Sequence, residues 1–283
     1  MFTTAQLERY SRQIVLPEVG GSGQARLADA SVLVIGAGGL GSPALLYLAA
    51  AGVGRLGVVD DDVVELSNLH RQVLHATADV GRAKVDSAAE RLTALNSGVT
   101  VEPLPVRLGP GNAHDVMKGY DVVLDGSDTF PTRYLVSDTC VELGTPLVYG
   151  ALSRFAGHVS VLAGGTAPCY RCLFPTPPPR GAVPTCAEVG VIGPLAGVIG
   201  SIMATEALRL LLGGFGPNDD HAAERRDSGE QHGLAGRLLV VDLYAPEVTT
   251  FELARDPECA VCGPNATIDG PIDYEQFCGT APA

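Results

Sequence analysis

The 283-residue sequence has few charged residues and only two lysines, Lys84 and Lys118. Charged side chains make up 18% of the chain and apolar ones 46%, which excludes an unfolded chain, because disordered chains combine low hydrophobicity with high charge. The net charge of -13 has the wrong sign for a protein held on phosphate backbones. We therefore expect a folded protein that does not bind nucleic acid.

The sequence also lacks a long uninterrupted apolar run. Its longest apolar stretch, 191–212, contains Pro194, Glu206 and Arg209, whereas a membrane span needs about 20 clean apolar residues. We interpret this stretch as a buried helix. Residues 1–16 carry charges and no apolar segment with a small-residue cleavage site, so we expect no signal peptide. The expectation is a cytoplasmic protein without membrane contact, whose cysteines are thiols or metal ligands.

Short β-branched runs alternate with helical segments over the first half of the chain. Residues 31–35 read as a strand, which a glycine turn connects to an Ala- and Leu-rich helix at 39–51. Further strands are expected at 56–59, 99–104, 121–124 and 146–149, and further helices at 80–95 and 130–143. This alternation predicts an α/β fold with a doubly wound, mostly parallel, Rossmann-like sheet covered on both faces.

The second half of the chain has a different texture. Strands at 157–162, 237–242 and 248–253 are expected to continue the sheet in antiparallel fashion. We predict one domain over 1–283, comprising a helical arm at 1–30 and two halves at 31–150 and 151–283. Two loops are predicted to be mobile, at 175–190 because of its prolines and at 213–236 because of its polar composition.

The glycine turn fits a nucleotide-binding fingerprint. Gly36, Gly38, Gly39 and Gly41 form G-x-G-x-x-G with one further glycine, and Asp60 follows 19 residues later at the end of the next strand. Glycines let the backbone approach a phosphate, the helix N-terminus offers free N–H groups, and the acid accepts from a ribose hydroxyl. The alternative is that these glycines only permit tight packing of helix on strand.

Cationic side chains beyond the turn favour a triphosphate over a dinucleotide. Arg71 and an amide lie in the segment S-N-L-H-R-Q at 67–72, and Lys84 begins the next predicted helix. Fixed cations stabilise the charge that develops on a triphosphate under attack, whereas a dinucleotide needs few of them. Both side chains could instead be solvated surface charges, and the fingerprint alone would suit an NAD-dependent oxidoreductase.

An acidic segment follows the strand at 121–124, at the edge where doubly wound sheets bind ligands. It runs Asp125, Gly126, Ser127, Asp128, Thr129. A carboxylate here could hold Mg²⁺ against phosphate oxygens, or could cap the next helix. We expect Asp125 or Thr129 to cap and Asp128 to act in the site.

Four of the seven cysteines form two C-x-x-C pairs. Cys169 with Cys172 and Cys259 with Cys262 supply the four thiolates of a closed tetrahedral zinc site, for which a structural role is expected. One such pair alone could be a redox pair. Cys186 ends the proline-rich loop and is either a buried apolar residue or a nucleophile.

Together these residues resemble the MoeB/ThiF family, relatives of ubiquitin-activating enzymes that adenylate the C-terminal glycine of ubiquitin-like sulfur-carrier proteins. The matching segments cover nearly the whole chain: Tyr10–Gln13, Gly36–Gly41, Asp60–Asp62, Ser67–Gln72, Lys84, Asp125–Asp128, both C-x-x-C pairs and Thr185–Gly190. The closing residues, 272–279, resemble the segment that leads into a rhodanese domain in longer members. The expectation is therefore a form without that domain.

The resemblance implies an ATP site and a division of labour. It implies that the glycines and Asp60 contact ATP, together with Asp62, Ser67, Asn68, Leu69, His70, Arg71, Gln72, Lys84, Asp128 and Thr129. The family often has Asn where this chain has Thr129. Catalytic roles fall to Arg71, Lys84 and Asp128, to Cys186 in sulfur chemistry, and to Arg12 as an arginine finger of a homodimer.

The cofactors implied are ATP, Mg²⁺ on Asp128, and Zn²⁺. The partners implied are a carrier protein ending in Gly-Gly, which the second half of the chain would bind, and a separate sulfur donor such as a rhodanese or a cysteine desulfurase. A non-catalytic scaffold that only binds a ubiquitin-like partner is the remaining alternative.

Overall fold

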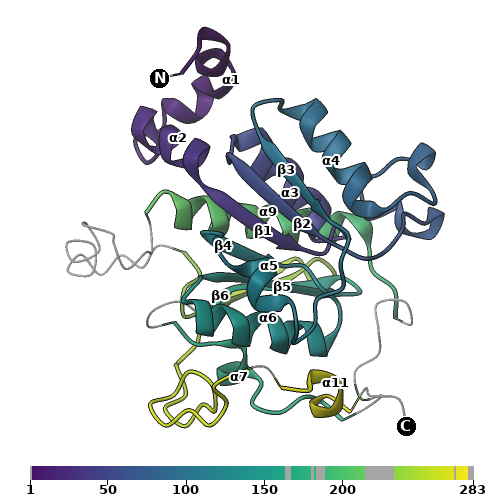
Figure 1. The fold of residues 1–283 in the computed structure, drawn as a ribbon, viewed down its shortest axis with the longest axis vertical. Coiled ribbons are helices and arrows are strands. Elements are labelled where there is room, and N and C mark those ends of the chain that lie inside the picture. Colours follow the sequence, from purple (N-terminus) through teal and green to yellow (C-terminus); the bar gives the residue numbers. More distant parts are fainter. Residues whose placement is uncertain are drawn as a thin grey trace.

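A computed structural model describes residues 2–162, 167–179, 182, 189–213, 233–270 and 272–279. One sheet, in the order β3-β2-β1-β4-β5-β6-β7-β8, runs through both halves of the chain (Figure 1). Its strands are β1 Ser31–Ile35, β2 Arg55–Val59, β3 Thr100–Leu104, β4 Val122–Asp125, β5 Leu147–Ser153, β6 Ala156–Leu162, β7 Arg237–Asp242 and β8 Glu247–Glu252. The first five strands are parallel and the last three join in antiparallel pairs, as predicted.

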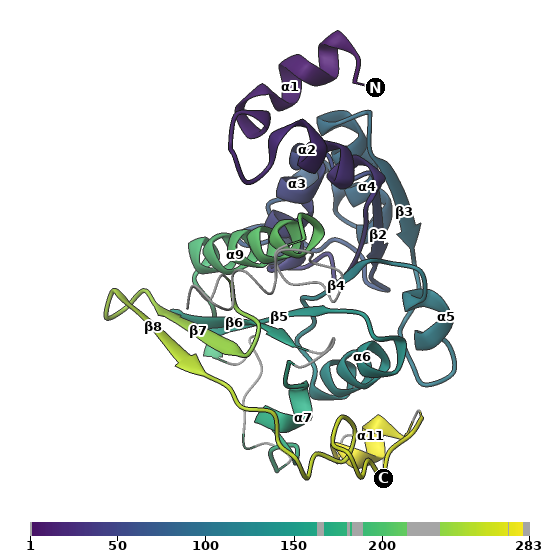
Figure 2. The ribbon, with the colours of Figure 1, turned by 90° about the vertical axis from the view of Figure 1, so that its left-hand side faces the viewer.

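Helices cover both faces of the sheet because the strands point apolar side chains alternately to each side. Val32 and Val34 of β1 belong to the core under α3 (Gly41–Ala51), α4 (Lys84–Leu95) and α9 (Gly193–Leu211). Leu33 and Ile35 belong to the core under α5 (Ala113–Met117) and α6 (Phe130–Leu143). Figure 2 shows α9 and α6 on opposite sides of the sheet. The doubly wound α/β prediction is therefore confirmed.

The helix α9 crosses α3 at small residues. A Cβ atom at Gly200 would lie 2.4 Å from Cγ of Pro43 and 2.5 Å from the carbonyl oxygen of Leu40, so only glycine allows this contact. By length and composition α9 could cross a membrane. It nevertheless packs on α3 and the sheet and contains the buried carboxylate of Glu206, as expected of a core helix.

The N-terminal arm consists of α1 (Thr4–Ile14) and α2 (Gly20–Asp29), and polar side chains fasten it to the body. Asn96 donates to the Tyr10 hydroxyl at 2.8 Å and to the carbonyl of Ala49 at 2.7 Å. Gln13 donates to the carbonyl of Ala51 at 3.1 Å. Because Ala49 and Ala51 lie in the last turn of α3, α1 rests on the end of α3 away from the glycine turn.

Two predicted boundaries differ from the structure by more than two residues. The helix expected from residue 80 begins at Lys84, because Gly81 adopts φ 90° and Ala83 bridges to Val63. The strand expected at 146–149 extends to Ser153, where Arg154, at φ 56°, turns the chain into β6.

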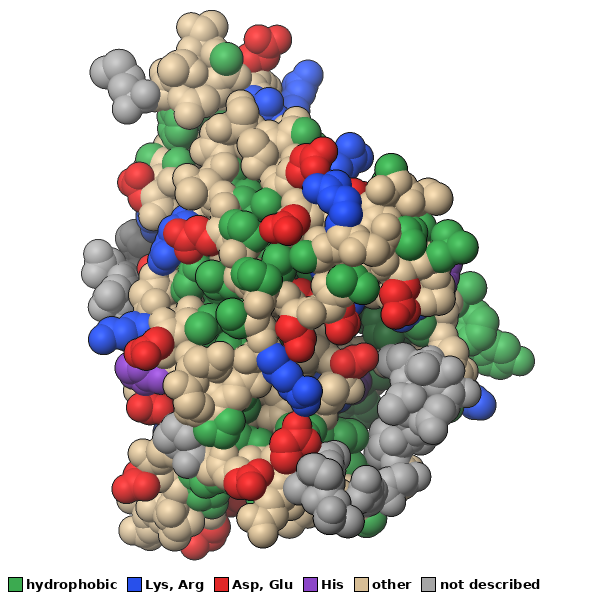
Figure 3. Space-filling model, turned by 45° about the vertical axis from the view of Figure 1, so that its right-hand side comes forward, with side chains coloured by type: hydrophobic (Ala, Val, Ile, Leu, Met, Phe, Trp, Pro, Cys, Tyr) green, Lys and Arg blue, Asp and Glu red, His purple; other side chains and the backbone are tan. Residues whose placement is uncertain are grey.

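Further short helices in the described part of the chain are η1 (Leu66–Asn68), η2 (Thr77–Asp79), α7 (Tyr170–Leu173) and α11 (Tyr274–Phe277). Leu234, inside the second loop predicted to be mobile, is buried, and its N–H donates to Glu206 at 2.9 Å. On the face in Figure 3, basic side chains lie singly among acidic and apolar ones.

Candidate functional site

The turn after β1 requires glycine at two positions for the sake of the fold. Gly36 adopts φ 90°, which side-chain-bearing residues rarely adopt, and at Gly41 a Cβ atom would lie 1.8 Å from the carbonyl oxygen of Gly36. At Gly38 and Gly39 the nearest atoms to such a Cβ are 3.7 and 3.6 Å away. The chain itself therefore tolerates a side chain there, so these two glycines leave room at the surface of the turn.

The open side of the turn carries donors without acceptors. The backbone N–H groups of Gly38, Gly39 and Leu40 donate to no acceptor in the described part of the chain. The Gln72 side chain, 4% exposed, lies against Gly38, and its carbonyl oxygen Oε1 has no hydrogen-bond partner among the described residues. The free N–H groups of a helix N-terminus are suited to bind an anionic ligand, whereas the amide oxygen of Gln72 can only accept a hydrogen bond.

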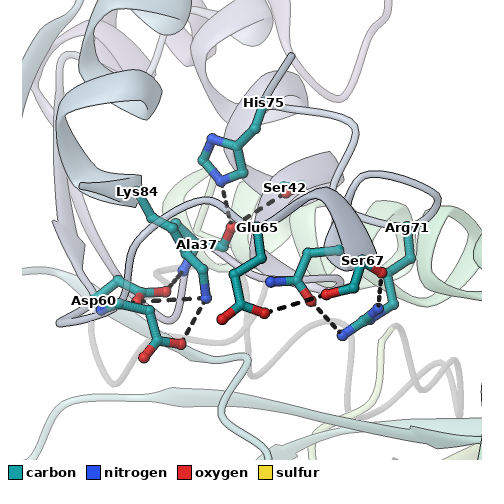
Figure 4. Close-up of polar contacts among 10 residues, drawn as sticks. Ala37, Ser42, Asp60, Glu65, Ser67, Arg71, His75 and Lys84 are labelled. Carbon is teal, nitrogen blue, oxygen red and sulfur yellow. Dashed lines mark hydrogen bonds and ion pairs between the residues drawn. The ribbon is translucent and has the colours of Figure 1, made fainter. Parts of the chain in front are cut away.

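Asp60, at the end of β2, holds the turn from below (Figure 4). Its Oδ2 accepts from the N–H of Ala37 at 2.8 Å, and its Oδ1 accepts from the N–H of Asp62 at 2.9 Å. Burial raises the pKa of Asp60, while the Lys84 ammonium and the two N–H donors oppose that rise. A carboxylate oxygen has two lone pairs, so Asp60 keeps acceptor capacity for a ribose hydroxyl.

Lys84 is buried at the start of α4 beside an acidic cluster. Its Nζ lies 2.7 Å from Oδ2 of Asp62 and 3.7 Å from Oδ1 of Asp60. The carboxylates of Asp60, Asp61 and Asp62 lie close together, and Lys84 supplies positive charge between two of them. The structure thus brings the predicted lysine and acids together beside the turn.

Arg71 lies on the other side of the turn, and neighbouring residues fix its guanidinium. Nη2 donates to Oδ1 of Asn68 at 3.1 Å, and Nη1 lies 2.9 Å from Nε2 of His70 and 3.4 Å from the carbonyl of Ser67. The Arg71 methylenes lie 3.7 Å from the Cβ position of Gly39. The predicted segment 67–72 therefore borders the open glycines. Leu69, within this segment, is the C-terminal cap of η1, and its N–H donates to the carbonyl of Leu66.

One histidine that contacts the turn from the side opposite Asp60 was missed by sequence reasoning. His75 is buried, with Nε2 3.0 Å from the carbonyl oxygen of Ala37 and Nδ1 2.9 Å from the hydroxyl of Ser87 (Figure 4). Burial lowers the pKa of His75, so the ring is neutral near pH 7. No sequence motif marks it, because 38 residues separate it from the peptide that it contacts.

The two acids at the end of β4 differ in exposure. Asp125 is buried, and its Oδ1 accepts from the N–H of Ser127 at 2.9 Å. Burial raises the pKa of Asp125, against the Ser127 hydroxyl and the Arg133 charge. Asp128 is exposed at the carboxyl edge of the sheet. The N-cap of α6 is Thr129, whose hydroxyl accepts from the N–H of Thr132, so the capping expectation is confirmed.

Arg12 is the predicted catalytic residue that the structure does not bring to the turn. It lies in the last turn of α1 and precedes Gln13, which contacts Ala51 at the end of α3. Because α3 begins at Gly41, its length of about 16 Å separates Arg12 from the glycine turn of the same chain.

The four predicted cysteines come together at a second site. Sγ of Cys169 lies 3.5 Å from that of Cys259 and 3.9 Å from that of Cys172, and the sulfurs of Cys172 and Cys262 are 3.4 Å apart. Zn–S bonds of 2.3 Å place tetrahedral sulfurs about 3.8 Å apart. The four side chains are free thiols. Their spacing and chemistry fit a closed zinc site, and all four would be its ligands.

The remaining predicted site residue, Cys186, lies outside the described residues. Much of the loop predicted at 175–190 and most of the one at 213–236 lie outside them as well. Within the first loop, Pro175–Pro179 are described and form no regular secondary structure.

Comparison with known proteins gives a consistent result. The model of the ThiF family matches residues 10–261. The sulfur carrier protein adenylyltransferase of Thermus thermophilus is 53% identical over 98% of both chains, and the SAMP-activating enzyme E1 of Haloferax volcanii is 50% identical over 96% of this chain and 95% of its own. Adenylyltransferase and sulfurtransferase MOCS3 of Bos taurus is 50% identical, and this chain spans 57% of its length.

Solved structures share the fold. MccB of E. coli superposes with a TM-score of 0.76 at 21% identity, covering 94% of this chain and 74% of that one. Its structure with ATP superposes with a TM-score of 0.73 at the same identity, covering 90% of this chain and 74% of that one. At this identity the likeness concerns the arrangement of strands and helices.

Proposed function

Because the chain belongs to the ThiF family, we propose that it is an enzyme that adenylates the C-terminal glycine of a ubiquitin-like sulfur-carrier protein. The relatives that match over nearly their whole length are named as an adenylyltransferase of sulfur carriers and as an activating enzyme E1. Adenylation would prepare the carrier for thiocarboxylate formation. The unit proposed is a single ThiF-like domain over the whole chain.

The observation that supports this function best is the open side of the glycine turn. Gly38 and Gly39 leave room, their N–H groups have no acceptor in the described structure, and Nε2 of the buried Gln72 amide lies 3.7 Å from the Cβ position of Gly38. Arg71 and Lys84 border the same turn from two sides. This set of donors and cations suits the phosphates of ATP, with Asp60 available to the ribose.

The reaction is attack of the carrier's C-terminal carboxylate on the α-phosphate of ATP, giving an acyl adenylate and pyrophosphate. The carboxylate is ionised at pH 7 and needs no general base. The enzyme therefore has to align two anions and neutralise their charge. Arg71 and Lys84 supply positive charge, and positioning can lower the barrier by about 7 to 11 kcal/mol.

Arg12 would serve the other subunit of a homodimer. It lies one helix length from its own glycine turn, so it can reach such a turn only on a second chain. An arginine finger in this place would add charge to the triphosphate of the partner. The proposal of a homodimer rests on this separation and on the family.

Asp128 is the residue that would hold Mg²⁺. It is exposed at the carboxyl edge of β4, and hard cations prefer carboxylate and phosphate oxygens. The metal would neutralise charge on the phosphates. Thr129 is occupied in capping α6, so its backbone, rather than its hydroxyl, would be free to face ATP.

The sulfur step is assigned to other groups. A separate donor, such as a rhodanese or a cysteine desulfurase, would supply sulfur that displaces AMP from the acyl group. Cys186 would take part in this step and not in adenylation. We place the enzyme in the cytoplasm, where free thiols persist.

The decisive experiment incubates the chain with ATP, Mg²⁺ and carriers ending in Gly-Gly, and follows the carrier by intact mass and the exchange of pyrophosphate into ATP. An added AMP establishes the proposed reaction. Binding of NADH in place of ATP would establish the oxidoreductase alternative. Carrier binding without any exchange would establish a scaffold instead.

A further inference from the structure

The backbone of Ala37 is held at both its N–H and its carbonyl oxygen, at the centre of the glycine turn. Its N–H donates to Asp60 at 2.8 Å, and its carbonyl oxygen accepts from His75 at 3.0 Å and from the Ser42 hydroxyl at 3.3 Å. Figure 4 shows His75 and Asp60 approaching Ala37 from opposite sides. Neither residue lies in the turn, so elements β2 and the segment before η2 fix its backbone from outside.

The contacts of His75 define its hydrogen positions. The carbonyl oxygen of Ala37 can only accept, so Nε2 must carry the hydrogen. In the neutral ring Nδ1 is then an acceptor, and the Ser87 hydroxyl donates to it at 2.9 Å. Ser87 thereby stabilises the tautomer that holds Ala37.

We propose that His75 is a positioning residue of the nucleotide site, which fixes Ala37 so that the N–H groups of Gly38, Gly39 and Leu40 point together at a phosphate. This inference rests on the proposed use of ATP and adds a residue to it. His75 touches the turn only through Ala37 and, being buried, is placed to act through that peptide.

The residues that flank Ala37 explain why the turn needs hydrogen bonds that fix its backbone. Gly36 and Gly38 border Ala37, and glycine restricts the backbone less than any other residue. Without His75, the carbonyl of Ala37 would keep the longer bond from Ser42 only. The three N–H groups would then sample more orientations, and each nucleotide bound would have to order them.

The test measures ATP binding to the full chain by calorimetry, together with steady-state exchange kinetics. Three variants are compared: His75→Phe, which keeps an aromatic ring but loses both hydrogen bonds; His75→Gln, which can still donate to Ala37; and Ser87→Ala, which removes the hydroxyl beside Nδ1 and leaves His75 in place. We expect ATP affinity to fall about tenfold in His75→Phe and about threefold in Ser87→Ala, and to recover in His75→Gln. The KM for ATP should rise while kcat at saturating ATP and the KM for the carrier stay unchanged.

Ser160→Ala is the matched control, because Ser160 is buried on β6 and its hydroxyl bonds Arg237 at 2.7 Å, two strands beyond β4. It should lower the melting temperature without changing ATP affinity. If the unmodified chain binds no ATP, the proposed function fails. If it binds ATP and both His75→Phe and Ser87→Ala bind equally well, the positioning role is refuted. Should His75→Phe not fold, Ser87→Ala decides in the same way.

Discussion

The glycine turn and the cysteine cluster are held together in different ways. At the turn, the protein's own groups fix the backbone: Asp60 and His75 hold Ala37, and Lys84 pairs with acids. In the cluster, four thiols face one another at 3.4 to 3.9 Å, and their geometry suits a metal that the chain must acquire. The first site is prearranged by hydrogen bonds, whereas the second depends on a cation for its cohesion.

Removing the metal should have the largest effect, and it should act on the cysteine cluster and not on the glycine turn. One zinc per chain is expected, and a strong chelator should lower the melting temperature by several degrees, because metal binding is coupled to folding. ATP affinity should change less than twofold, since the turn is held independently. Cys169→Ser should lose zinc, whereas Cys140→Ala, the control at a buried thiol outside the cluster, should retain it. A chain without zinc, or an unchanged melting curve, contradicts this prediction.

A substitution at Arg71 tests the glycine turn instead of the cysteine cluster. Arg71→Ala should reduce carrier-dependent pyrophosphate exchange by about 100- to 1000-fold, the cost of removing one group that stabilises developing charge. The melting temperature should shift little, and zinc should remain bound. Arg91→Ala, at an exposed arginine on α4, is the control and should leave exchange within about twofold. Full exchange in Arg71→Ala would remove that residue from the site.

Lowering the pH should decrease the stability of the folded chain, and His158 of β6 should account for part of this loss. Burial, together with the Arg133 charge, lowers the pKa of His158 to about 4, against 6.5 in the unfolded chain. Between these values the unfolded chain binds the extra proton, so stability falls as pH decreases from about 6.5 towards about 4. At pH 5 this contribution is about 2 kcal/mol relative to neutral pH.

His158→Gln should reduce that loss. We would measure the free energy of unfolding in urea at pH 7.5 and at pH 5, for the unmodified chain and for His158→Gln. The loss of stability between the two pH values is then compared between the two proteins. The shared loss from His75, whose pKa burial also lowers, cancels in this comparison. Identical pH dependence in both chains would show that His158 titrates normally in the folded state.

The smallest effect is expected at Cys186. Cys186→Ala should leave adenylation within about twofold, because the role proposed for this thiol begins after the acyl adenylate forms. Exchange kinetics measure the first step and thiocarboxylate mass the second. A block of exchange itself would move Cys186 into the adenylation chemistry.

The sequence predicts the sheet well because each strand carries its own signal. The β-branched run of β1 and the C-x-x-C pairs are local patterns, and the strand order follows from their alternation with helices. The start of α4 was predicted too early, since the apolar spacing continues through Val80 into a turn that Gly81 sets. Apolar periodicity alone does not reveal where such a turn ends.

The charged residues of the candidate site could be predicted from the sequence, but the residues that position its backbone could not. Arg71, Lys84 and Asp60 belong to recognisable segments, so their grouping could be expected. His75 and Ser87 have no motif, because a buried histidine is read from sequence as a core residue. Only the folded chain shows that its two nitrogens join Ala37 to α4.

A metal bound by both cysteine pairs would also constrain the chain before it folds. Cys169 and Cys259 are 90 positions apart, so a metal held by both would close a loop of that size even in the denatured ensemble. By the chain-entropy relation used for covalent cross-links, such closure lowers the conformational entropy of the unfolded state. Expressed as free energy, this would raise the stability of the folded state by about 4 to 5 kcal/mol. The antiparallel strands β7 and β8 lie inside this loop, so their edge of the sheet would assemble from a segment already tied at both ends.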